Sequence, residues 1–328
     1  NMENQSKNTL EIMSVLSEKN IYKLSLIEEL GRNDLFLLYA PLAGSIVLAS
    51  AAETEAIENQ VARCEKGDCE MEGDEWAGIV DALVADPFRS SNNSNVTDPA
   101  DFLRMYILPN YICNFACSYC FSARGRSDKA LRQEHLKAAL DYFINPRRTA
   151  SRRLALTYLG GGEPTLSWNL LRFGLEYAGQ LAETHNFELL TTIVTNGSRI
   201  TREMVKTFSR HRVRVRVSFE ILEDIQRKQR GAYEAVCRGL DLLSQGDVKP
   251  MVRSMITPDN VCLMPQMIET LHRRFPYVKE ALFDPIISAD IFREAEFTQM
   301  FYDTYSHVFL QARALAASYG INLKCAPL

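Results

Sequence analysis

The stretch FLRMYILPNYICNFACSYCF, residues 102–121, joins an apolar segment to three closely spaced cysteines. Residues Phe102 to Leu108 are rich in apolar and aromatic side chains and predict a β-strand. Cys113, Cys117 and Cys120 follow it in C-x₃-C-x₂-C spacing. This spacing places the three thiols in the loop at the C-terminal end of the strand, which is the edge where chemistry collects in barrel-like α/β folds.

Strand-like and helix-like patterns alternate from this stretch onward. The predicted strands are Phe102–Leu108, Leu154–Leu159, Leu189–Thr195, Val213–Phe219, Lys249–Thr257 and Glu280–Ile287. The predicted helices span residues 129–144, 168–185, 201–210, 232–244, 261–274 and 295–319. Strand–helix units with right-handed crossovers predict a parallel sheet covered by helices. These units are too few for the closed eight-unit barrel. We therefore predict an α/β fold with a partial (β/α)6 TIM-like barrel over residues 102–320, with a flat doubly wound sheet as the alternative.

A different pattern precedes this array. Residues 34–50 predict two apolar strands, interrupted around Pro41 and Gly44, and residues 52–63 and 75–85 predict helices. Residues 89–101, RSSNNSNVTDPAD, are rich in Ser, Asn, Asp and Pro and predict a linker. We therefore expect a small N-terminal α+β domain over residues 1–88.

The composition limits where the protein is expected to be located and what it is expected to bind. The chain has 328 residues, of which 46% are hydrophobic, and a formal net charge of −4. Neither a membrane-length apolar span nor an export signal is recognisable, so we expect a cytoplasmic location and no membrane partner. The slightly acidic balance disfavours general binding to nucleic acid. Because cytoplasmic thiols stay reduced, clustered cysteines indicate a metal site rather than disulfides.

Three neighbouring thiols can be interpreted in more than one way. Thiolates are the usual ligands of iron–sulfur clusters, and a cluster of four irons normally takes four of them. Cys113, Cys117 and Cys120 without a nearby fourth ligand would leave one iron open to a small molecule. The alternatives are a zinc knuckle that uses a distant fourth ligand, or three unrelated buried cysteines. The spacing favours a metal site without deciding which metal.

A second motif, LGGGEP, occupies residues 159–164 at the end of the next predicted strand. Glycines such as Gly161 and Gly162 allow a backbone to approach a ligand closely. Glu163 then places a carboxylate at the strand end, where it can pair with an ammonium group. By itself the motif is more typical of a tight turn with a solvated glutamate, because glycines most often serve turns. Its position, one strand after the cysteine loop and at the same edge of the sheet, favours a binding role.

These two motifs together resemble the radical S-adenosylmethionine (SAM) superfamily. The resemblance rests on the C-x₃-C-x₂-C spacing, the aromatic Tyr119 before the last cysteine and the GGE sequence one strand later. It implies a [4Fe–4S] cluster on the three cysteines, with the open iron chelating SAM. It also implies that Tyr119 lies near the adenine and that Gly161, Gly162 and Glu163 bind the amino group of SAM. The implied chemistry is one-electron cleavage of SAM followed by hydrogen abstraction from a substrate.

Further strand ends carry polar residues at positions that related enzymes use for the ribose and carboxylate of SAM. Asn196, Ser218 and Glu220 are candidates, although the family often has Ser-x-Asp-Gly where this chain has SFEI. Arg230 and Arg253 are candidates for neutralising the SAM carboxylate. All of these residue types also serve in turns and caps.

The alternation of Arg and Val in RHRVRVRV, residues 210–217, predicts a strand with one arginine face. We expect those arginines to line a peptide groove or to pair with acidic neighbours.

The same region resembles radical SAM peptide maturases of the SPASM type, over roughly residues 102–325. That resemblance implies a ribosomally made precursor peptide with a leader segment as substrate, crosslinking or another oxidative modification as product, and a one-electron reductant such as flavodoxin or ferredoxin. Cys325 lies where the cysteine-rich region begins in those enzymes. Residues 321–328 are therefore expected to open a SPASM or twitch-like region, with Cys325 as a ligand of an auxiliary iron–sulfur cluster.

Other interpretations stay open at this point. Within the superfamily they are sulfatase-type protein maturation, RNA modification and a small-metabolite substrate. Outside it, the chain would be a non-catalytic, metal-stabilised binding protein. The N-terminal domain can be a leader-peptide recognition module, because an exposed strand edge can pair with a peptide, or a structural cap on the barrel.

Overall fold

The computed structural model describes residues 13–17, 21–25, 34–40, 45–65, 76–84, 102–288 and 291–325. The chain divides into two units, Asn1–Thr97 and Asp98–Leu328. The predicted linker, residues 89–101, lies outside the described residues, and the description resumes at Phe102. Over the described ranges, no helix combines the length and the apolar character needed to span a bilayer.

The first unit is a four-stranded antiparallel sheet with two helices. Its strands β1 (Met13–Ser17), β2 (Ile21–Ser25), β3 (Leu35–Ala40) and β4 (Ser45–Ser50) are hydrogen-bonded in that order. Helices α2 (Ala51–Glu65) and α3 (Ala77–Val84) follow, and Leu38, Ala49, Ile57 and Val80 belong to their shared core. The later pair of strands and both helices match the predicted elements, whereas the short β1 and β2 were not predicted.

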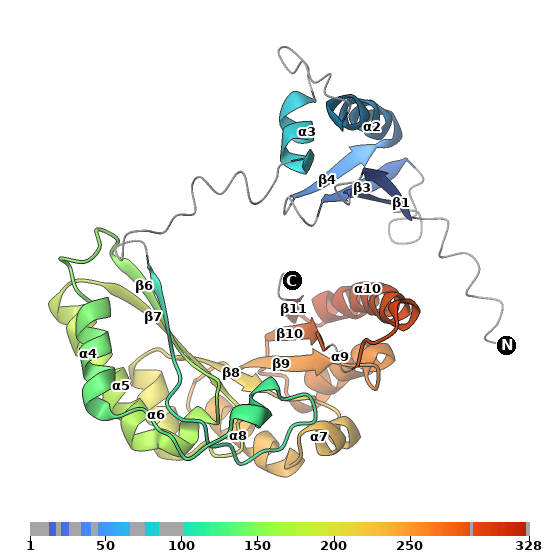
Figure 1. The fold of residues 1–328 in the computed structure, drawn as a ribbon. Helices are drawn as coiled ribbons and strands as arrows, with labels where there is room; N and C mark the ends of the chain where they lie inside the picture. The colour runs from blue at the N-terminus through green and yellow to red at the C-terminus, as the bar shows by residue number, and fades with distance from the viewer. Residues whose placement is uncertain are drawn as a thin grey trace. The chain divides into compact units, whose positions relative to one another are not determined.

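The second unit contains a seven-stranded parallel sheet. The strands are β5 (Arg104–Ile107), β6 (Arg153–Tyr158), β7 (Glu188–Thr195), β8 (Arg214–Ser218), β9 (Met251–Ile256), β10 (Glu280–Pro285) and β11 (Asn322–Lys324). They lie side by side in sequence order, with β5 and β11 at the two edges. Figure 1 shows this sheet curving from β6 and β7 toward β10 and β11. The α/β fold with an open, barrel-like sheet is confirmed, and the sequential strand order excludes the doubly wound alternative.

The sheet extends further than the sequence predicted. Residues Asn322–Lys324 pair with β10 as a seventh strand, beyond the predicted barrel end at residue 320. A three-residue strand with one buried side chain is too short to show a period-2 pattern. Residues 326–328 lie outside the described residues.

Helices connect the strands as expected for right-handed strand–helix units. They are α4 (Gln133–Phe143), α5 (Trp168–Thr184), α6 (Arg202–Arg210), α7 (Glu223–Gln229), α8 (Tyr233–Gln245), α9 (Met264–Arg274) and α10 (Ala295–Ser318). The short helix α7 was not predicted. Thr201 caps the start of α6, because its hydroxyl accepts a hydrogen bond from the Met204 N–H at 3.2 Å. Asn260 does not cap with its side chain, because its amide oxygen accepts from the Thr257 N–H at 2.7 Å.

Side chains alternate between the two faces of this sheet. On one face, buried residues such as Leu156, Ile193 and Val215 form the core with the helices. We call the opposite side the open face. The residues that lie on it by register include Arg104, Tyr106, Ala155, Thr157, Leu190, Thr192, Val194, Arg214, Arg216, Ser218, Met251, Arg253, Glu280, Leu282 and Asp284.

Candidate functional site

The three cysteines lie on the loop between β5 and the 3-10 turn η3 (Phe121–Gly125), and each is partly buried. Phe115, between the first two, inserts into the core and anchors the loop. The Ser118 N–H donates to the Gln229 carbonyl at 2.9 Å, which attaches the loop to the end of α7. The fold therefore holds Cys113, Cys117 and Cys120 at the C-terminal edge of the sheet.

The donor types of this loop suit an iron–sulfur cluster. All three thiols are free. In the part of the chain that the structure describes, no three His, Cys, Asp or Glu side chains gather around one metal-ion position. Zinc binds its ligands around one ion, whereas each thiolate of a [4Fe–4S] site holds a different iron. Three local thiolates can therefore hold three corners of a cluster.

Arg126 is a neighbour of this loop that the sequence interpretation missed. Its Nη2 lies 3.8 Å from the Cys120 Sγ, in a donor position. Its buried Nε has no hydrogen-bond partner among the described residues. A guanidinium so placed can donate a hydrogen bond to the Cys120 sulfur.

The glycines of LGGGEP serve a close approach between two backbones. A Cβ on Gly162 would lie 1.9 Å from the Ile112 carbonyl oxygen, and one on Gly161 would lie 2.8 Å from the Asn110 carbonyl oxygen. The Glu163 N–H donates to the same Ile112 oxygen at 2.7 Å. The turn after β6 is thus hydrogen-bonded to the start of the cysteine loop, and any side chain at these glycines would separate the two.

Glu163 is buried, with 2% of its surface exposed. Its Oε1 accepts from the Thr165 N–H at 3.0 Å, the Thr165 hydroxyl at 2.6 Å and the Thr195 hydroxyl at 2.6 Å. Among the described residues, its Oε2 accepts only from the Asn196 N–H, at 2.7 Å. Among the described residues no cation forms an ion pair with this carboxylate. The negative charge is therefore held by neutral donors, and Oε2 keeps acceptor capacity.

Asn196 connects the end of β7 to the cysteine loop. Its Nδ2 donates to the Asn114 Oδ1 at 2.9 Å, and its Oδ1 accepts from the Ser198 N–H and hydroxyl. The Asn114 Nδ2 donates in turn to the Ser198 hydroxyl at 2.9 Å. The Asn196 side chain, a candidate for binding the ribose or the carboxylate of SAM, is therefore already hydrogen-bonded to the loop between Cys113 and Cys117.

A second buried carboxylate, Glu220, joins Tyr119 to Arg230. The Tyr119 hydroxyl donates to Glu220 through a short hydrogen bond, and the Arg230 Nη1 donates to the Tyr119 oxygen at 2.7 Å. The same Nη1 lies 3.6 Å from Glu220 in an ion pair. Glu220 also accepts from the Ser254 hydroxyl at 2.6 Å and the Met255 N–H at 3.0 Å. Both carboxylate oxygens of the candidate residue Glu220 thus accept hydrogen bonds from protein groups. The residue is 0% exposed.

Burial dominates the electrostatics of this cluster. Burial raises the pKa of the Glu220 carboxyl, with Arg230 acting in the opposite direction. Burial and the negative Glu220 raise the pKa of Tyr119, so its phenol stays protonated and donates. Burial alone would lower the pKa of Arg230, but Tyr119 and Glu220 raise it above its ordinary value. Burial also raises the pKa of the Cys117 thiol, opposed by Arg230.

Arg230 retains binding capacity that the cluster does not use. Its Nε is buried and has no hydrogen-bond partner among the described residues. An unpaired N–H in such a position is costly unless a ligand satisfies it. A carboxylate is the group that a guanidinium binds best, so the Nε of Arg230 is a donor suited to an anionic ligand.

The two candidates on β8 and β9 lie side by side on the open face. Ser218 is opposite Arg253 in the sheet register. The Arg253 Nε is 2.5 Å from the Asp284 Oδ2. The Nε of Arg253 is therefore already paired with a carboxylate, whereas the Nε of Arg230 has no partner among the described residues.

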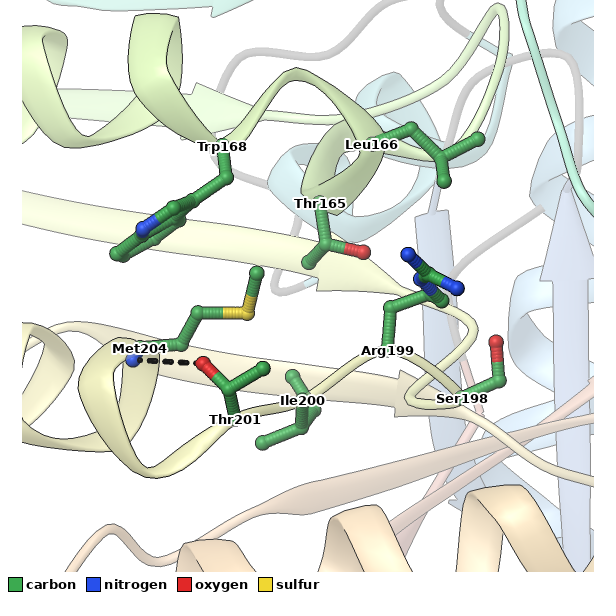
Figure 2. Close-up of a pocket in the computed structure, with 8 residues that line it drawn as sticks. All are labelled: Thr165, Leu166, Trp168, Ser198, Arg199, Ile200, Thr201 and Met204. Atoms are coloured by element: carbon green, nitrogen blue, oxygen red, sulfur yellow. Dashed lines mark hydrogen bonds between the residues drawn. The ribbon is translucent and has the colours of Figure 1, made fainter.

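A hollow of about 410 Å³ adjoins the site between the turn after β6 and the start of α6. In Figure 2, Trp168, Leu166 and Thr165 face Arg199 and Met204 across it. Its lining residues are Thr165, Leu166, Trp168, Ser198, Arg199, Ile200, Thr201 and Met204. The hydroxyls of Thr165 and Ser198 bond to Glu163 and Asn196, so the hollow shares residues with the carboxylate site.

The comparisons with known proteins agree with this geometry. The profile of the Radical SAM superfamily matches residues 107–271, which is half of the chain. The chain belongs to the radical SAM superfamily. Membership implies a [4Fe–4S] cluster and SAM, and it confirms the resemblance found in the sequence.

Solved structures show the same fold at low identity. The structure of anSMEcpe with bound AdoMet superposes with a TM-score of 0.59 and 18% identity, over 68% of this chain and 63% of that chain. Streptococcus suis SuiB bound to its precursor peptide SuiA superposes with a TM-score of 0.53 and 14% identity, over 89% of this chain and 69% of that chain. The chain thus spans 63% of the length of anSMEcpe. No curated protein matches the sequence.

Several residues of the site carried no recognisable signal in the sequence. Thr195, Ser254 and Asn110 are small polar residues in or next to apolar strands, where a core or turn role is the ordinary interpretation. Asn110 nevertheless donates to the Glu163 carbonyl at 3.0 Å and to the Ser167 hydroxyl at 2.8 Å. Only the folded chain brings these groups to the carboxylates.

Proposed function

We propose that this protein binds a [4Fe–4S] cluster through Cys113, Cys117 and Cys120, cleaves SAM reductively, and abstracts hydrogen from a ribosomally made precursor peptide. The observation that carries the proposal is the attachment of the cysteine loop to two strand-end carboxylate sites. Glu163 and Asn196 hold one side of the loop, and Tyr119 with Glu220 and Arg230 holds the other. A bound cluster would supply the electron that breaks the carbon–sulfur bond of SAM.

The residues present offer a complementary partner for each charged end of SAM. Glu163 carries a negative charge without a protein counter-ion among the described residues, and it would accept the ammonium group beside Gly161 and Gly162. Arg230, with its unsatisfied Nε, would bind the SAM carboxylate. Tyr119 would contact the adenine, and Ser218 the ribose. Glu220 would act through Tyr119 and Arg230 by fixing their positions.

Precise positioning matters because a reactive centre by itself selects poorly among C–H bonds. The open face of the sheet would admit an extended peptide to the strand ends. A one-electron reductant such as flavodoxin or ferredoxin would approach the partly exposed cysteine loop. Cys325, free and exposed after β11, would contribute to an auxiliary cluster.

The first unit would recognise the leader segment of the peptide. Its strands β1 and β4 each have one unpaired edge within the described sheet, and a peptide can add to such an edge as a strand. The superposition with SuiB, which was solved with a precursor peptide, covers more of this chain than the second unit alone contains. A structural similarity at this identity supports the fold, and the peptide role is our proposal.

Anaerobic reconstitution with iron and sulfide tests the enzyme class. We expect a brown protein that converts SAM to 5′-deoxyadenosine under reducing conditions, and a colourless Cys113→Ala/Cys117→Ala/Cys120→Ala variant. The matched control Cys262→Ala, at an exposed thiol on η5 (Val261–Leu263), should retain the absorbance band. Zinc without iron in an anaerobic preparation would contradict the proposal.

Mass spectrometry tests the substrate. The enzyme is incubated with short peptides encoded beside its gene, and we expect loss of hydrogen from one of them. A chain shortened to residues 98–328 should still cleave SAM and should bind the peptide less tightly. Equal peptide affinity of the two chains would make the first unit a cap, and alteration of a small metabolite instead of a peptide would contradict the peptide proposal.

A further inference from the structure

Three arginines on the open face of the sheet have no counter-ion among the described residues. Arg104 lies on β5, and Arg214 and Arg216 lie on β8. None of them forms a hydrogen bond or an ion pair with any residue in the ranges that the structure describes. Each therefore carries a positive charge that the known part of the fold does not neutralise.

The other charged residues of this face neutralise one another. Their pairs are Arg153–Glu188 at 2.9 Å, Arg253–Asp284 at 2.5 Å and Lys324–Glu280 at 3.7 Å. The face is thus left with a local positive excess, although the chain as a whole has a formal net charge of −4. A local positive surface raises the concentration of anionic partners beside it.

Of these three arginines, Arg216 lies nearest in its strand to the candidate residue Ser218. It is partly buried, and in the sheet register it lies between Val194 on β7 and Met251 on β9. Ser218, at the end of the strand, lies two residues further along, a distance of roughly 7 Å in a β-strand. A guanidinium set among apolar neighbours is unfavourable without an anionic partner.

We propose that the open face binds an acidic segment of the peptide substrate, with Arg216 pairing an aspartate or glutamate close to the residue that loses hydrogen. This inference rests on the proposed function and names its substrate class. A carboxylate can accept two parallel hydrogen bonds from one guanidinium, which fixes both position and orientation. Arg214 and Arg104 extend the positive charge toward the N-terminal ends of the strands, along which the acidic segment continues.

The neighbouring side chains favour a peptide over a nucleic acid. Tyr106 and Leu190, both exposed, and Val194 and Met251 lie on the same face. Apolar side chains between charges suit a peptide of mixed composition. Asp284 and Glu280 lie on this face as well, and their carboxylates would repel a continuous phosphate backbone.

Fluorescence anisotropy on the full-length, cluster-loaded protein tests the inference. The probes are a short fluorescein-labelled peptide with several aspartates, the same peptide with asparagines in their place, and a labelled oligouridylate. We expect the acidic peptide to bind at least about tenfold more tightly than its asparagine counterpart, since a charge-assisted hydrogen bond contributes more than a neutral one. Arg216→Gln should weaken binding of the acidic peptide about tenfold, and Arg216→Lys should weaken it less, because lysine keeps the charge and loses the bidentate geometry.

The matched control is Arg313→Gln, at an exposed arginine on α10, which should bind the acidic peptide like the unaltered protein. Equal affinity for the acidic and asparagine peptides, or an affinity unaffected by Arg216→Gln, would overturn the inference, as would tighter binding of the oligouridylate. Thermal unfolding of each variant identifies a loss of fold. Formation of 5′-deoxyadenosine by the unaltered protein is measured in parallel. If it occurs while acidic peptides fail to bind, the proposed function stands and this inference alone fails.

Discussion

Two buried carboxylates, Glu163 after β6 and Glu220 after β8, lie at the same edge of the sheet and differ in how their charge is held. Glu163 accepts hydrogen bonds from neutral groups only, contributed by Thr165, Thr195 and Asn196. Glu220 is hydrogen-bonded to Tyr119 and lies 3.6 Å from the buried Arg230. One carboxylate is thus available to a cation from outside, and the other already has its cation.

This difference indicates that one carboxylate binds a ligand and that the other fixes the positions of its neighbours. A buried charge without a counter-ion is costly and is maintained where a ligand completes it. A buried charge with a hydrogen-bonded partner instead fixes the geometry of its neighbours. We therefore interpret Glu163 as a group that contacts SAM, and Glu220 as a positioning residue for Tyr119 and Arg230.

The largest expected effect follows from removing the Glu220 charge. Glu220→Leu leaves Arg230 buried without a counter-ion, so we expect the free energy of unfolding to fall by about 3–5 kcal/mol. Urea unfolding monitored by circular dichroism measures this change. The matched variant Glu203→Leu, at an exposed carboxylate paired with Arg172, should cost less than about 1 kcal/mol. Similar losses in both variants would show that Glu220 and Arg230 do not depend on each other.

The next effect concerns SAM binding at Glu163. Glu163→Gln removes the negative charge while keeping the size of the side chain, and we expect SAM affinity to fall about 10- to 100-fold, because a hydrogen bond to a charged group contributes about 1.5–3 kcal/mol. Isothermal titration calorimetry on the cluster-loaded protein measures it. Glu203→Gln, at an exposed carboxylate paired with Arg172, serves as the control and should leave the affinity unchanged. An unchanged affinity in Glu163→Gln would remove the distinction between the two carboxylates.

A smaller effect is expected at the phenol that joins Glu220 to Arg230. Tyr119→Phe removes one hydroxyl that both accepts and donates in a buried network, and we expect a loss of about 1–2 kcal/mol of stability. Tyr177→Phe is the matched control, because Tyr177 donates to the exposed Asp141, which keeps its ion pair with Lys137. Tyr177→Phe should reduce the free energy of unfolding by about 0.5 kcal/mol. A larger loss for Tyr177→Phe than for Tyr119→Phe would contradict the special role of the buried network.

The smallest effect is a pH dependence at a partly exposed carboxylate. Burial raises the pKa of Asp241, but hydrogen bonds from Arg274 and Tyr277 lower it more, so the net shift is downward. Because the folded-state pKa lies below the unfolded one, the stabilisation is present above about pH 4 and is lost as the pH falls through the folded value. Asp241→Asn should therefore reduce the pH dependence of the unfolding midpoint below about pH 4. An identical acid profile for both proteins would show that Arg274 and Tyr277 do not stabilise the charged form.

The superfamily could be predicted from local sequence alone, from the cysteine spacing, the GGGEP motif and the alternation of strand and helix patterns. Each of these is a short-range pattern, in which neighbouring residue types decide the outcome. The cap at Thr201 belongs to the same class, because a hydroxyl and an N–H three residues later meet within one turn. The short strand β11 and the helix α7 were not predicted, since neither is long enough to show a period.

Only the tertiary structure decided which carboxylate is paired with a cation. It also decided which arginines have no carboxylate partner among the described residues. Glu220 and Tyr119 are about a hundred residues apart in sequence, and a glutamate after a strand predicts nothing about its partner. The alternation of RHRVRVRV predicts an arginine face, but whether that face is neutralised depends on the strands beside it. Parallel strands bring side chains together through crossovers of many residues, so register, and not sequence separation, sets these contacts. That is why Arg253 has Asp284 as its counter-ion, while Arg216, opposite Met251 in the same sheet, has none among the described residues.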